Sequence, residues 1–134
     1  MVTHHTALIY TMVLVSAADG DMTDAELATI GEIVRTLPVF RDCNDDLLTG
    51  ASEDCANLLG EDDGLETVLG IIARSLPATL RETAYVVACD VAAADLVADQ
   101  EELRLLEMLR FRLEIDRLPA AGIERATLAR HATS

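Results

Sequence analysis

The sequence predicts an all-α fold of about seven helices, forming a single domain over residues 1–134. Hydrophobic residues make up 51% of the chain, yet only two Tyr and two Phe are aromatic and there is no Trp. Helical bundles suit such an aliphatic interior better than β-sandwiches, whose strands are rich in aromatic and β-branched residues. Only three prolines and seven glycines interrupt the chain, which leaves room for long helices.

The predicted helices have recognisable ends. Residues 3–18 are apolar on most faces, which predicts a buried helix. Thr23 and Glu26 have the Thr-x-x-Glu spacing of a capping box, and Pro38 ends the helix that they begin. Further capping boxes are predicted at Asp63–Glu66 and Thr79–Glu82, and Asp99 with Glu102 caps the sixth helix. The predicted helices cover residues 3–18, 23–37, 44–59, 63–76, 79–94, 99–113 and a last segment that begins near Pro119.

Two acidic turns at a fixed offset suggest that the chain contains two related halves. Asp19 matches Asp95 and Glu26 matches Glu102 at an offset of 76 residues (95 − 19 = 76). The same offset aligns the apolar residues Leu27, Ile30 and Ile33 with Leu103, Leu106 and Leu109. We therefore expect a pseudo-symmetric bundle of two helix-loop-helix halves, with the third and fourth helices as the crossover.

The two turns are dense in carboxylates. The candidate ligands of a metal ion are Asp19, Asp21, Asp24 and Glu26 in the first turn and Asp95, Asp99 and Glu102 in the second. Capping accounts for the two glutamates, which occupy the third position of their helices. Asp19 and Asp95 are different, because each falls at the C-terminal end of a helix, where the macrodipole disfavours a carboxylate by up to about 1 kcal/mol.

Two arrangements would offset that cost, and the sequence leaves both open. The aspartates can accept hydrogen bonds from N–H groups of the loop, as in an Asx turn. Alternatively they bind a divalent cation, because carboxylate and carbonyl oxygens are the ligands that Ca²⁺, Mg²⁺ and Mn²⁺ prefer. An EF-hand is excluded, since its twelve-residue loop requires glycine at the sixth position, whereas Gly20 directly follows Asp19.

These turns also carry a family resemblance. An apolar helix that runs into Ala17, Ala18, Asp19 and Gly20, with Glu26 and Leu27 opening the next helix, resembles the TerB-like (tellurite-resistance protein B) family. The resemblance implies an all-helical fold of two related halves and a non-enzymatic bacterial protein associated with tellurite and stress response. It also implies metal binding by Asp19, Glu26, Asp95 and Glu102. The second turn departs from the pattern, because Leu96 stands in place of the glycine, and the chain contains no lysine.

The charge of the chain limits its partners. The net charge is −14, so phosphate backbones and anionic lipid surfaces are repelled, and a basic protein surface is the natural partner. The charge is uneven: residues 1–70 carry 14 acidic and 2 basic residues, a net of −12, whereas residues 71–134 carry 10 and 8, a net of −2. The apolar run of residues 7–18 is shorter than the about 20 residues that cross a bilayer, so no integral membrane segment is expected.

The remaining chemistry-bearing residues indicate no enzyme, and no catalytic residue is assigned. The histidines lie at the chain ends, where we expect irregular termini. Three cysteines without a Cys-x-x-Cys spacing indicate reduced thiols and a cytoplasmic protein, with Cys43 the one most exposed. Asp90 lies in an apolar helix and is expected to pair with an arginine. Two functions fit this pattern: a cation-binding module of the tellurite or stress-response type, or an acidic scaffold that binds proteins and holds no ligand.

Overall fold

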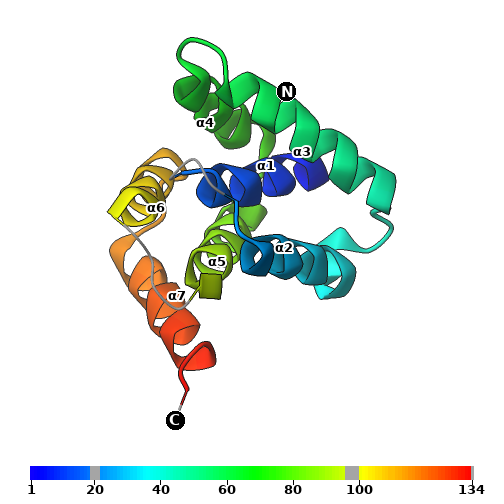
Figure 1. Ribbon diagram of the computed structural model, residues 1–134. Helices are drawn as coiled ribbons and strands as arrows, with labels where there is room; N and C mark the ends of the chain where they lie inside the picture. Colours follow the sequence, from blue (N-terminus) through cyan, green and yellow to red (C-terminus); the bar gives the residue numbers. More distant parts are fainter. Residues whose placement is uncertain (19–21, 96–99, 134) are drawn as a thin grey trace.

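The computed structural model describes residues 1–18, 22–95 and 100–133, except the side chain of Asp95. Over these residues the fold is all-α, with seven α-helices and no strand, as the sequence predicts (Figure 1). Short 3-10 helices follow three of them, at Pro38–Phe40, Ala78–Leu80 and Ala93–Asp95. The α-helices are α1 (His4–Ser16), α2 (Asp24–Thr36), α3 (Asp45–Leu59), α4 (Gly64–Ser75), α5 (Arg81–Ala92), α6 (Gln100–Arg112) and α7 (Arg117–Arg130).

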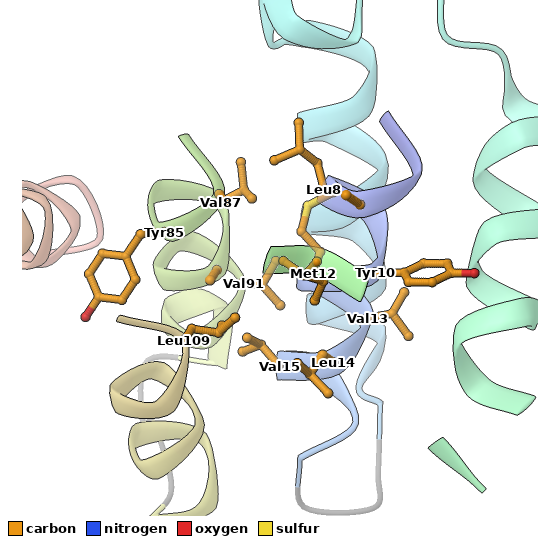
Figure 2. Packing of buried hydrophobic residues seen from close by; sticks show 14 of the residues in the cluster. Leu8, Tyr10, Met12, Val13, Leu14, Val15, Tyr85, Val87, Val91 and Leu109 are labelled. Carbon is orange, nitrogen blue, oxygen red and sulfur yellow. The ribbon is translucent and has the colours of Figure 1, made fainter. Parts of the chain in front are cut away.

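The centre of the domain is α1. Every residue from Ala7 to Ser16 is buried, because α3, α4 and α5 all pack around this helix. Figure 2 shows Met12 and Val15 directed toward α5 and α6, while Tyr10 is directed to the opposite side. Burial on all sides explains why the sequence of α1 lacks a polar face.

The second central helix is α5, which packs chiefly against α1 and α7. Both α2 and α6 contact α1 as well as α5. Leu27 and Leu103, which the offset of 76 residues aligns, are similarly exposed, at 49% and 53%.

Two of the predicted capping boxes are wrong. Asp63 precedes α4 in a left-handed conformation (φ 56°), from which its side chain makes no bond to the helix. The connection from α3 is too tight for an extended cap, since Gly64 lies against the backbone of Leu58 and Leu59. Thr79 lies inside the 3-10 helix Ala78–Leu80, and that helix leads directly into α5 without a side-chain cap.

The histidines and Asp90 have defined partners. His5 belongs to α1, and its Nε2–H donates a 2.8 Å hydrogen bond to the carbonyl oxygen of Val39. Its ring also stacks on Phe40, so the expectation of an irregular terminus at the first two histidines is wrong. Asp90 pairs with Arg130, as predicted, and its carboxylate also lies 3.5 Å from the His131 ring. Both contacts fasten the end of α7 to α5.

Candidate metal centre

The structure describes three of the seven candidate ligands in full. Asp19, Asp21 and Asp99 lie outside the described residues, and only the backbone of Asp95 is described. The remaining three are Asp24, Glu26 and Glu102.

Glu26 closes the predicted capping box at the start of α2. Its Oε1 accepts hydrogen bonds from the Thr23 backbone N–H (3.0 Å) and hydroxyl (3.2 Å), and the Thr23 hydroxyl accepts one from the Glu26 N–H (3.1 Å). The glutamate is only 2% exposed. Capping does not require such burial, because most residues at this position point into solvent, and a carboxylate is costly to remove from water.

Glu102 repeats this burial in the other half. It is the third residue of α6, as Glu26 is the third residue of α2, and it is 3% exposed. Asp24 differs from both, because it is the first residue of α2 and is exposed. At about 100° per residue, positions one and three of a helix lie on nearly opposite faces, so the structure does not bring Asp24 to the buried side with Glu26.

The burial of the two glutamates was not predicted from the sequence, although a signal was present. The buried stripe of α2 continues from Glu26 to Ile30 and Val34, with spacings of four residues. Leu27, the first large apolar residue of α2, does not belong to this stripe, because it is half exposed. The stripe therefore starts one residue earlier, at a carboxylate, and the same shift applies to Glu102 and Leu103 in α6.

Other groups near the two turns add oxygen atoms to this region. Ser16, the last residue of α1, is 1% exposed, and its hydroxyl oxygen has no hydrogen-bond partner among the described residues. The 3-10 helix Ala93–Asp95, from which the second turn departs, packs against α2, which follows the first turn. The beginning of one turn thus lies near the helix that leaves the other.

The candidate ligand atoms in this region are all oxygen atoms. They suit a hard cation such as Ca²⁺, Mg²⁺ or Mn²⁺ better than zinc, which favours Cys and His ligands. Within residues 1–18, 22–95 and 100–133, no three His, Cys, Asp or Glu side chains lie close enough to hold a metal ion. A metal site that includes Glu26 and Glu102 would therefore need further ligands from the turn aspartates.

The cysteines do not provide a reactive alternative. Burial raises the pKa of both Cys55 and Cys89 to about 12. Cys43 is partly exposed, but desolvation and the nearby Asp45 raise the pKa of its thiol as well. All three favour the protonated form, which is a poor nucleophile.

The seven helices of the described residues define an all-α domain. The chain matches the family of tellurite resistance protein TerB over residues 5–124, and it belongs to that family. No curated protein and no solved structure matches it. No helix in the part of the chain that the structure describes is long and apolar enough to cross a membrane.

Proposed function

We propose that this chain is a non-enzymatic, cation-binding module that acts in the response of a bacterium to tellurite or related stress. The ligands come from both turns: Asp19, Asp21, Glu26, Asp95, Asp99 and Glu102. The observation that carries this proposal is the pair of glutamates, Glu26 and Glu102, buried at the same helical position after each turn. A bound cation would offset the cost of removing both carboxylates from water.

Membership of the TerB family supports the association with tellurite. The raised pKa values of the three thiols argue against reduction of tellurite by a thiolate of this chain. We therefore assign the protein a binding role in the bacterial cytoplasm and no catalytic one.

Calorimetric titration of the metal-free protein with Ca²⁺, Mg²⁺ and Mn²⁺ tests the proposal. We expect saturable binding of at least one cation, weakened by Asp19→Ala and by Asp95→Ala. Asp62→Ala is the matched control, because this aspartate lies in an exposed turn outside the repeat. The absence of binding heat at millimolar metal, or equal binding by all three variants, would show that the turns hold no ion.

A second function, an acidic scaffold without a ligand, is favoured by the surface of α3 and its flanking turns. Eight carboxylates there are exposed, and none forms an ion pair with a described residue. They are Asp42, Asp45, Asp46, Glu53, Asp54, Glu61, Asp62 and Asp63. This surface can attract a basic protein. A partner that remains bound in chelator, leaves at high salt and is lost after Asp45→Lys with Asp46→Lys would favour this function over metal binding.

A further inference from the structure

A groove between α5, α6 and α7 lies beside the second acidic turn, since Ala93 and Leu103 are among its lining residues. Its volume is about 1100 Å³. The floor is α5, with Tyr85, Cys89 and Ala92, and the walls are α6 and α7, which both pack on α5 but contact each other little. Figure 1 shows α6 and α7 on the same side of α5. A bundle of three helices with its two outer members apart has room for a fourth.

The size of the groove suits a helix. An α-helix about 10 Å wide occupies about 1100 Å³ over a length of roughly 14 Å, or nine to ten residues. The walls are apolar at their rims, because Leu103 of α6 and Leu128 of α7 line the groove and are more than half exposed. Of the seven large apolar side chains that are exposed in the described residues, four belong to this helical pair: Leu103, Phe111, Leu118 and Leu128.

The charge pattern of α7 indicates which helix fits. Arg117, Ala121, Glu124 and Leu128 follow one another at spacings of four, three and four residues, so they share one face, and all four are exposed and line the groove. Arg117 makes no ion pair with any described residue, and Glu124 accepts a hydrogen bond from the Tyr85 hydroxyl at 2.5 Å. The stripe carries one positive and one negative charge on either side of a small residue.

Such a stripe is complementary to itself when it is turned end to end. A two-fold axis beside Ala121 places Arg117 opposite the partner's Glu124, and Glu124 opposite the partner's Arg117. The two charge pairs then lie about 10 Å from each other along the helix axis. Alanine at the axis allows the two helices to approach closely. Each α7 then lies between α6 and α7 of the other chain, so both grooves are filled at once.

The distribution of charge over the whole chain favours the same surface. Residues 1–70 carry a net charge of −12, so two copies repel each other most strongly through that half. Residues 71–134, which include all three helices of the groove, carry only −2. A contact between copies meets the least repulsion here.

We propose that the protein forms a two-fold symmetric homodimer in which α7 of each copy occupies the α5–α6–α7 groove of the other. This inference does not depend on metal binding, since none of the residues that line the groove is a proposed metal ligand.

The test is the mass of the full-length protein in solution, measured by sedimentation equilibrium from low to high micromolar concentration. We expect a dimer for the wild-type chain and a monomer for Ala121→Trp, which fills the groove at the axis. Ala126→Trp should remain a dimer, because Ala126 is exposed on the same helix but does not line the groove. Circular dichroism establishes that both variants are folded.

Charge reversal makes the test specific for the two-fold pairing. Arg117→Glu alone and Glu124→Arg alone each place like charges opposite one another, so each variant should be monomeric. When the two variants are mixed, every pair is again of opposite sign, and a one-to-one heterodimer should form. The restored association excludes a simple folding defect, including one caused by loss of the Tyr85–Glu124 hydrogen bond.

Three results would overturn the proposal. The first is a wild-type chain that is monomeric at every concentration, even if its groove binds a small apolar ligand or a foreign peptide. A dimer that survives Ala121→Trp and Arg117→Glu would use another surface. Failure of the mixed charge variants to associate would show that Arg117 and Glu124 do not meet across an interface.

Discussion

Replacing Glu26 or Glu102 with glutamine distinguishes a capping role from a metal-binding role. Glutamine keeps an acceptor oxygen, so at Glu26 the hydrogen bonds with Thr23 can persist, since both Glu and Gln complete a capping box. The change weakens charge-assisted bonds by about 1 kcal/mol and also removes a buried charge, which is favourable. We therefore expect the free energy of unfolding of the metal-free variants to stay within about 1 kcal/mol of wild type, or roughly 3–5 °C in Tm.

The effect of metal should be larger. A ligand at a hundred times its Kd stabilises the folded state by about 2.7 kcal/mol, which corresponds to roughly 10 °C for a domain of this size. Wild-type protein should show such a rise in Tm between chelator and saturating metal, measured by scanning calorimetry. Glu26→Gln and Glu102→Gln should each lose most of it, because a neutral amide is a weaker ligand for a hard cation.

Glu66→Gln is the matched control. Glu66 is also the third residue of its helix, but its side chain is 63% exposed and pairs with Arg112 at 2.9 Å. It should retain the full metal-induced rise. The reasoning is refuted if Glu26→Gln and Glu102→Gln also retain that rise, or if the metal-free variants are destabilised by more than about 3 kcal/mol, which would indicate a purely structural role.

Three further predictions concern stability and thiol reactivity. Gly64→Ala should destabilise the fold by more than about 2 kcal/mol in urea unfolding, because its Cβ would lie 2.4 Å from a carbonyl oxygen of α3. Gly50→Ala should instead stabilise the fold by about 0.5–1 kcal/mol, because Gly50 lies in a helix interior with open space around it. Equal effects of the two substitutions on stability would contradict this contrast. The free energy of unfolding should fall as the pH rises from 9 to 12, because burial raises the pKa of Cys55 and Cys89 from 9.0 to about 12. In this range the thiols of the unfolded state lose their protons while those of the folded state keep them. A flat profile of Tm against pH would count against the burial of both thiols. Alkylation of the native protein near pH 8 should modify Cys43 alone at an appreciable rate, and mass spectrometry showing prompt labelling of all three cysteines would disagree with the structure.

Most of the fold could be predicted because local signals determine where helices begin and end. Thr23 caps its helix as expected, and Pro38 follows the end of α2 closely. The capping pattern failed at Asp63, where tight packing of Gly64 on the preceding helix determines the backbone conformation. A sequence motif specifies which bonds are available but not whether the tertiary structure permits them.

The candidate site was predicted only in part for a similar reason. The repeat identifies the two turns, yet the burial of Glu26 depends on which face of α2 meets α5, and a shift of one residue in the apolar stripe reverses the assignment of Glu26 and Leu27. The groove beside α7 could not be predicted at all. It exists because α6 and α7 pack on α5 more than on each other, and no local sequence pattern specifies how far apart these two helices lie.

We propose that one cation binds between the two acidic turns. Crystals of the protein grown with Mn²⁺ provide the sharpest test, because anomalous scattering identifies the ion itself. We expect an anomalous peak with oxygen ligands at about 2.1–2.3 Å, drawn from Glu26, Glu102 and the turn aspartates. Density that contains only water between the turns would contradict it.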